Sequence, residues 1–185
     1  MPKKPFLAGR QEFGALYGVK PAQVTQWVAR DVLNYDRAVI VSGSPYWLMS
    51  FVRGFGQLTP RPKELDQLAL QRILAEQEPG VWVESVDELP PLLGLQEATQ
   101  LFGLSSQQNL SAVVRQGRFA APDYQLSGSP LWILDTLIEA APEIQAKSRT
   151  LTWAVDPAVE TALRQRRYDG PGSVIVPRGS AAKAL

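Results

Sequence analysis

The string SGSPYW occupies positions 42–47 of the chain, and SGSPLW, with a single exchange, returns at positions 127–132. The two strings are 85 residues apart, and at this offset 12 of the 37 positions from Gln11 to Trp47 are identical without a gap. A match of this length indicates one structural unit that is present twice. The repeated string is therefore the most visible part of a longer duplication, and this duplication decides the fold that we expect.

Two helices separated by a tight turn are predicted ahead of the string in each copy. In the first copy, Gln11–Tyr17 places apolar side chains at helical spacing, and Gly18 ends that helix. Pro21 opens a second helix that runs to about Arg30, because proline fits the first helical position. The matching segments of the second copy are Glu97–Phe102, Gly103 and Ser105–Gln116. Both copies thus predict a helix, a turn and a helix.

The repeated string itself predicts the tip of a β-hairpin. Ala38–Val41 is predicted as a strand, Ser42–Pro45 as a turn rich in Ser, Gly and Pro, and Trp47 as an anchor of the returning strand. We expect Trp47 and Trp132 to be buried in equivalent places. A further apolar segment, Leu48–Phe55, is predicted to start a helix that packs back on the core.

The order EFGALYGVKPAQVTQWVARD, followed by VIVSGSPYW, resembles the MerR/excisionase-type winged helix-turn-helix domains. The resemblance covers residues 9–55 and 94–140. It implies a mainly α fold with small β-hairpin wings, arranged as two tandem winged helix-turn-helix domains. It also implies binding of double-stranded DNA, with the second helix of each copy in the major groove and the hairpin, or wing, near the DNA backbone or the minor groove.

The repeat and the charge distribution divide the chain into four parts. We expect the first copy over residues 1–58, a helical, acidic connector over 59–92, the second copy over 93–142, and a helix plus a basic C-terminal tail over 143–185. The formal net charge is +5 over residues 1–62, −5 over 63–92, −2 over 93–142 and +3 over 143–185. A polyanion would therefore meet the first copy and the tail before the rest.

The candidate DNA contacts are polar residues of the second helices and of the first hairpin tip. They are Lys20, Gln23, Thr25, Gln26, Arg30, Ser42 and Ser44 in the first copy, and Gln107, Gln108, Ser111, Arg115 and Arg118 in the second. Glutamine can read adenine in the major groove through two hydrogen bonds, Lys and Arg neutralise phosphates, and the N–H and hydroxyl groups of serine can bind the DNA backbone. The alternative for the helix residues is a solvated surface, and for the hairpin a plain structural turn.

Composition argues against catalysis and against a membrane location. The chain has no His and no Cys, which removes the commonest metal ligands and His-based catalysis. Its carboxylates gather in the acidic connector, where a solvated linker explains them, and it has no phosphate-binding glycine motif. We expect no enzyme activity, no metal and no cofactor. Because the chain has no run of 18 apolar residues and no secretory signal, we expect a cytoplasmic protein that does not contact membranes.

Two functions from different classes remain open at this point. The first is a bacterial or phage DNA-binding protein that regulates transcription or acts as an accessory factor in recombination or partition. The second is an adaptor whose winged-helix folds dock a protein partner or a second copy of the chain, which the mildly acidic second copy favours. In the first case, a head-to-tail tandem predicts recognition helices that point in the same sense, on direct or asymmetric half-sites about 10 base pairs apart.

Overall fold

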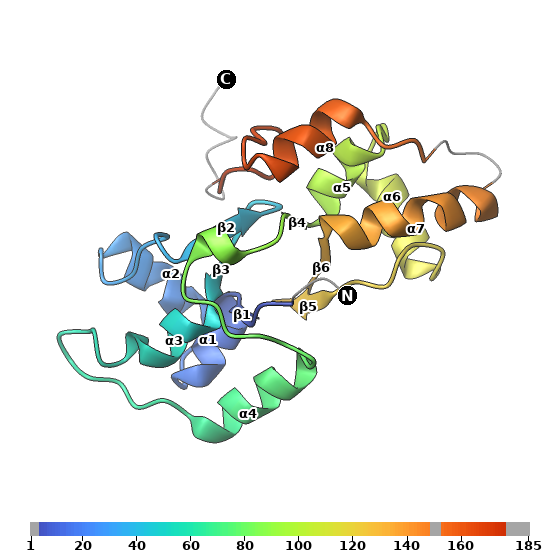
Figure 1. Cartoon of the computed structure of the whole chain (residues 1–185). Coiled ribbons are helices and arrows are strands. Elements are labelled where there is room, and N and C mark those ends of the chain that lie inside the picture. The colour runs from blue at the N-terminus through green and yellow to red at the C-terminus, as the bar shows by residue number, and fades with distance from the viewer. Residues whose placement is uncertain (1–3, 149–152, 177–185) are drawn as a thin grey trace.

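The computed structural model describes residues 4–148 and 153–176 of the chain. Over these ranges it contains eight α-helices and two three-stranded antiparallel sheets, which form two α+β units (Figure 1). The first unit consists of β1 (Leu7–Ala8), α1 (Arg10–Leu16), α2 (Pro21–Ala29), β2 (Ala38–Val41), β3 (Ser44–Leu48), α3 (Met49–Phe55) and α4 (Gln67–Glu76). The second unit consists of β4 (Leu92–Leu93), α5 (Leu95–Leu101), α6 (Gln107–Arg115), β5 (Tyr124–Leu126), β6 (Ser129–Ile133), α7 (Leu134–Lys147) and α8 (Pro157–Arg164). A short 3₁₀-helix, Val86–Glu88, lies between the two units along the chain.

The hairpin tips have the predicted place and a defined turn type. Val41 pairs with Ser44 and Leu126 pairs with Ser129, so each loop has two residues. The φ angles are 47° and 74° at Ser42-Gly43 and 49° and 75° at Ser127-Gly128. Positive φ at both central positions is the type I′ geometry that matches the twist of a hairpin. The Ser-Gly pair of the repeated string therefore closes both hairpins in the same way.

A third strand in each sheet was not predicted from the sequence. β1 pairs with β3 and β4 pairs with β6, which gives the strand orders β1-β3-β2 and β4-β6-β5. Both added strands are only two residues long and wholly apolar, so they show no alternation that could mark them as strands. Each sheet is thus a hairpin with one extra edge strand that precedes the first helix of its unit.

The central strand of each sheet buries side chains on both faces. Trp47 and Trp132 are each 0% exposed and point into the helical core of their own unit, which confirms their predicted burial. Their indole nitrogens donate hydrogen bonds to the backbone oxygens of Asn34 and Ala120, both at 2.9 Å. The intervening side chains belong to a separate cluster between the two sheets. This alternation follows from the two-residue period of a strand.

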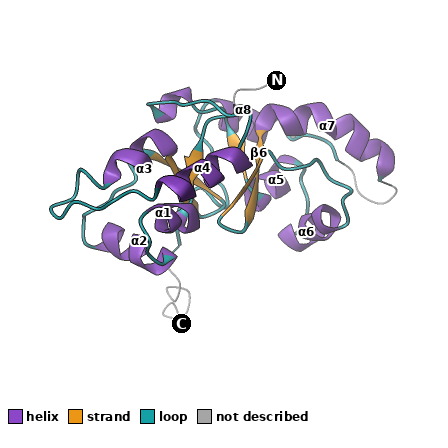
Figure 2. Cartoon of the chain, turned by 90° about the horizontal axis from the view of Figure 1, so that it is seen from below, coloured by secondary structure: helices purple, strands orange, loops and turns teal. Residues whose placement is uncertain are grey.

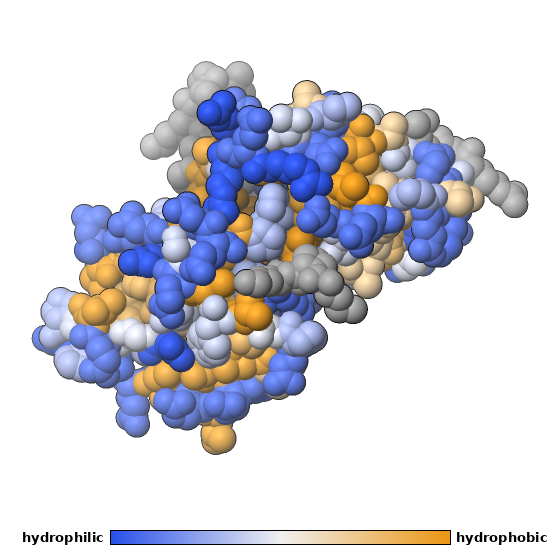
Figure 3. Space-filling model, viewed as in Figure 1, coloured by the Kyte–Doolittle hydropathy of each residue, from blue (hydrophilic) through white to orange (hydrophobic). Residues whose placement is uncertain are grey.

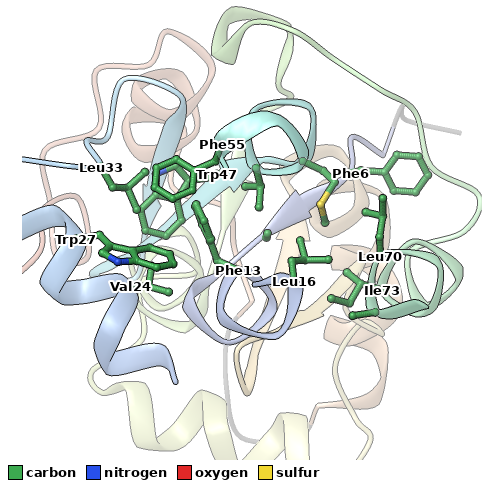
Figure 4. Close-up of a cluster of buried hydrophobic side chains, with 14 residues drawn as sticks. Phe6, Phe13, Leu16, Val24, Trp27, Leu33, Trp47, Phe55, Leu70 and Ile73 are labelled. Carbon is green, nitrogen blue, oxygen red and sulfur yellow. The ribbon is translucent and has the colours of Figure 1, made fainter. Parts of the chain in front are cut away.

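The core of the first unit is built around aromatic rings (Figure 4). Phe13 lies at its centre, with ring centroids 5.9 Å from Trp27, 5.2 Å from Trp47 and 5.1 Å from Phe55, all in edge-to-face arrangements. Such pairs stabilise a core by about 0.5–1.5 kcal/mol each beyond the burial of their area. The helices α1, α2 and α3 are thereby fixed to one another and to β3.

The predicted connector is part of the first unit. Leu70 and Ile73 of α4 belong to the same buried core as α1 (Figure 4), and Leu163 of α8 occupies the corresponding place in the second core. The N–H of Asp66 donates to Leu16 at 2.8 Å, and that of Asp156 donates to Leu101 at 2.7 Å. Because these contacts match, the duplication extends through α4 and α8, and each unit needs its last helix to close its core.

Two other boundaries differ from those expected from the sequence. Helix α7 runs from Leu134 to Lys147, with Pro142 inside it, and so continues across the expected end of the second copy at residue 142. The helix expected within the connector extends only over residues 67–76, and the C-terminal part of the chain contains α8 over 157–164. The basic tail expected at the C-terminus lies outside the described residues from position 177 on. In the described part of the chain, no helix is both long enough and apolar enough to cross a bilayer.

Candidate nucleic-acid interface

The tip of the first hairpin is bound to the start of the first helix of the second unit. The N–H of Ser42 donates to Glu97 Oε1 at 2.6 Å, and its hydroxyl donates to Glu97 Oε2 at 2.5 Å. The same hydroxyl oxygen accepts a hydrogen bond from the N–H of Gln96 at 3.1 Å. Ser42 therefore has its donors committed to protein, and this tip does not present them to a nucleic acid.

The tip of the second hairpin makes the same contacts with the first unit. The N–H and hydroxyl of Ser127 donate to the two carboxylate oxygens of Glu12 at 3.0 and 2.9 Å. The N–H of Gln11 donates to Ser127 Oγ at 3.1 Å. Each participating residue has its equivalent in the other contact, 85 positions away. We call this pair of contacts the clasp.

Reciprocal contacts of this kind define the relation between the two units. When residue i of one body contacts residue j of the other, and j of the first contacts i of the second, the bodies are related by a two-fold axis. Ser42 contacts Glu97, and Ser127 contacts Glu12, the equivalent of Glu97. The two units therefore pair as the two halves of an internal dimer.

Each clasp glutamate also caps its own helix. Glu12 accepts a hydrogen bond from the N–H of Gly9 at 3.0 Å, and Glu97 accepts one from Gly94 at 3.1 Å. These contacts satisfy an N–H that the helix start leaves without an intrahelical partner. A Cβ atom on Gly9 or Gly94 would lie 2.2 or 2.3 Å from the serine hydroxyl of the other unit. Glycine is thus required here because the hairpin tip approaches so closely.

The faces of the two sheets that point away from the helical cores pack against each other. Leu7, Tyr46 and Leu48 of the first sheet and Leu131 and Ile133 of the second share one cluster, and each of these side chains is at most 1% exposed. Burial raises the pKa of Tyr46 to about 12. Both hairpins therefore contribute to the apolar contact between the two sheets, which we call the seam.

This arrangement corrects the sequence interpretation of the hairpin tip. Ser42 was predicted as a DNA contact, yet its N–H and hydroxyl bind Glu97 because the tip is uncharged and complements a carboxylate. Ser44 is half-buried and lines, with Arg10 and Ser127, a hollow of about 360 Å³ at the seam. The glutamates that hold the tips were not predicted. Their identity in both copies, four residues after a buried apolar pair, was the available signal.

The second helices of the two units keep the polar surface expected of them. On the first, Lys20, Thr25, Gln26 and Arg30 are exposed, while Gln23 is half-buried. On the second, Gln107, Gln108, Arg115 and, just beyond the helix, Arg118 are exposed, while Ser111 is half-buried. Figure 2 shows α2 and α6 near the two ends of the molecule, toward the same side of it. The structure thus places α2 and α6, which carry most of the predicted residues, toward one side of the molecule.

Equivalent positions of α2 and α6 are not related by the 85-residue offset of the gapless sequence match. Both have nine residues, and their N-caps are Lys20 and Ser106, which are 86 rather than 85 positions apart. Their first buried side chains, Val24 and Leu110, show the same spacing. The turn before α6 holds one more residue than the turn before α2. The identities of Gln23 with Gln108 and of Arg30 with Arg115 therefore do not join equivalent positions.

Arg164, the last residue of α8, and Arg166, just beyond it, are engaged with protein. Arg164 forms ion pairs with Asp135 at 2.9 Å and Glu160 at 3.0 Å. The guanidinium of Arg166 donates to three backbone oxygens of the segment between the units, those of Val86, Asp87 and Leu89, each at 2.7 Å. The guanidinium groups of Arg164 and Arg166 thereby hold α8 to α7 and to the segment between the units.

Past α8, the chain returns to the first hairpin. The N–H of Gly43, at the tip of that hairpin, donates to the backbone oxygen of Gly172 at 2.9 Å. A Cβ atom on Gly172 would lie 2.9 Å from Ser42 Cα, which shows how closely the C-terminal segment covers this half of the clasp.

Over the described ranges, no group of three or more Asp and Glu side chains is placed to hold a metal ion. Comparison of the chain with protein-family models, with curated proteins and with solved structures finds no match.

Proposed function

We propose that this chain is a double-stranded DNA-binding protein made of two winged helix-turn-helix units, in which α2 and α6 enter the major groove. The observation that carries the proposal is that these two helices lie toward the same side of the molecule. Each is the second helix of a helix-turn-helix pair, each has an exposed polar surface, and both lie toward one side of the molecule (Figure 2). A major groove is wide enough to admit one such helix.

The exposed side chains of α2 suit it as the stronger of the two readers. Lys20 at its start and Arg30 at its end can neutralise phosphates on either side of the groove. Thr25 and Gln26 are exposed between them, and glutamine can pair with an adenine edge. At the equivalent ends α6 carries Ser106 and Gln116, so its cations are Arg115 and Arg118 near its C-terminal end.

In this proposal the hairpins do not contact DNA, although the resemblance to winged helix-turn-helix domains implies that they do. A wing would reach the DNA backbone beside the recognition helix. In this chain both hairpin tips are held in the clasp, so the proposed contacts to DNA come from the helices and their flanking cations. Such a protein could regulate transcription or act as an accessory factor in recombination or partition.

The proposal is tested by measuring DNA affinity against salt concentration. We expect the double variant Lys20→Ala/Arg30→Ala to bind selected DNA more weakly and to reduce the slope of log K against log[salt] by roughly 2, since each lost phosphate contact removes about one unit. Arg72→Ala is the control, because it removes one exposed cation from α4, outside both proposed recognition helices. If both proteins bind like the wild type, α2 is not the reader.

A protein-docking function is the second candidate, and one observation favours it. Leu58 lies in the loop between α3 and α4, Leu68 lies in the first turn of α4, and they are 71% and 83% exposed. Figure 3 shows hydrophobic residues at the surface in the region where Figure 1 draws α4. If no duplex DNA is retained at low salt, this surface becomes the first place to look for a protein partner.

A further inference from the structure

We propose, resting on the DNA-binding function above, that this single chain reads two unlike half-sites in inverted orientation at one fixed spacing. The observation behind it is the reciprocal clasp. A tandem joined like beads on a string would repeat by translation and would place its recognition helices in the same sense. The clasp instead exchanges equivalent residues, Ser42 with Glu97 and Ser127 with Glu12, which is the contact pattern of a two-fold axis.

Inverted orientation follows from that axis. A two-fold rotation that relates the units also relates α2 to α6, so the helices approach the duplex in opposite senses along it. A duplex has the same symmetry about its own dyads, which is why two-fold proteins bind inverted half-sites. The expectation of direct half-sites, drawn from the order of the copies along the chain, is replaced by the geometry of their pairing.

Fixed spacing follows from the packing of the seam. The side chains between the two sheets, among them Leu48, Leu131 and Ile133, are at most 1% exposed. Removing such side chains from water stabilises the contact between the two sheets. A flexible linker would let the units adapt to several spacings, whereas a packed seam and two clasps hold α2 and α6 in one relation.

The two half-sites must differ in sequence, because the two reading surfaces differ. With equivalent positions 86 apart, Thr25 stands where α6 has Ser111, Gln26 where it has Ala112, and Arg30 where it has Gln116. Val28 and Val114 are identical at this spacing, and both are half-buried. The chain is thus a two-fold scaffold that carries two different readers.

The experiment begins with DNA selected from a random pool by the full chain. The two half-sites found are then rebuilt in duplexes with the second half-site inverted as selected, reversed to direct orientation, or moved by one to three base pairs. We expect binding to weaken roughly tenfold or more in the reversed and moved duplexes, since the second set of base contacts is then lost. A probe with one half-site alone should bind as weakly as these.

The outcomes separate the two proposals. Equal affinity for direct and inverted probes, or for several spacings, overturns the inverted, fixed-spacing arrangement while leaving DNA binding intact. No enrichment of any sequence and no binding at low salt removes the DNA-binding function and, with it, this arrangement. As a second measurement, Gln26→Ala should change the preference only in one half of the selected site and Ser111→Ala only in the other. Changes in the same half would also overturn the proposal.

Discussion

At the residue scale, Glu12 and Glu97 each have two structural roles. Each carboxylate caps its own helix by accepting from the glycine three residues earlier, and each binds the serine at the hairpin tip of the other unit. A buried carboxylate is costly unless its oxygens are hydrogen-bonded. Glu97, 2% exposed, accepts three hydrogen bonds within 3.1 Å and thereby meets this condition.

We expect Glu97→Ala to lower the free energy of unfolding by about 3 kcal/mol, because it leaves buried N–H groups without an acceptor. Glu12→Ala should cost less, since Glu12 is only half-buried. Urea denaturation followed by tryptophan fluorescence measures both. Glu139→Ala, at an exposed position of α7, serves as the control and should change stability by less than about 0.5 kcal/mol. Equal stability of all three variants would show that the clasp contributes nothing to folding.

At the scale of elements, the sequence did not show that α4 and α8 close the cores of their units. Their helical pattern was visible, but α4 lies in an acidic stretch between two repeats, which is typical of a solvated linker, and α8 lies in the basic C-terminal part of the chain. Only tertiary contacts show that Leu70, Ile73 and Leu163 close the cores of their units. The amphipathic face of such a helix indicates that it packs on something, and it does not say on which neighbour.

We expect Ile73→Ala on α4 to cost about 2–5 kcal/mol, as for other large-to-small changes in a packed core. Ile73 is 4% exposed, whereas Leu68 on the same helix is 83% exposed. Leu68→Ala is therefore the matched control and should leave the midpoint of unfolding nearly unchanged. If the two variants had equal stability, α4 would be a linker after all.

The local elements of each unit could be predicted from the sequence, and the pairing of the units could not. Helices around Gly18, a hairpin around Ser42-Gly43 and burial of Trp47 follow from short-range patterns of turn residues and apolar spacing. The bond from Ser42 to Glu97 spans 55 positions and joins two polar residues that look like ordinary surface residues. The one-residue shift of α6 was hidden because a gapless match scored well on chance identities.

At the scale of the whole molecule, the seam gives the protein a distinct response to alkali. Burial raises the pKa of Tyr46 to about 12, mainly through desolvation of the charged form. Burial also raises the pKa of Tyr124, whose hydroxyl donates to the backbone oxygen of Pro5 at 2.6 Å. The folded chain therefore retains these phenolic protons at pH values where the unfolded chain loses them.

We expect the stability that Tyr46 contributes to be fully present below about pH 10 and to be lost as the pH rises toward 12. The slope from one such group approaches about 1.4 kcal/mol per pH unit. Urea midpoints measured from pH 8 to 11.5 should fall more steeply for the wild type than for Tyr46→Phe, which has no proton to lose. Parallel curves would show that Tyr46 titrates alike in both states.

The clasp also explains where the two halves of the chain have stayed alike. A reciprocal contact needs the same residues on both sides, and the Gln-Glu pair and the Ser-Gly-Ser-Pro string are indeed identical in the two units. The exposed positions of α2 and α6, aligned by their caps, share no identity. This is the pattern expected when the gene of a self-pairing protein is duplicated and fused. Once both partners are encoded in one chain, the exposed surface of each half can diverge while the clasp residues that join the halves stay alike.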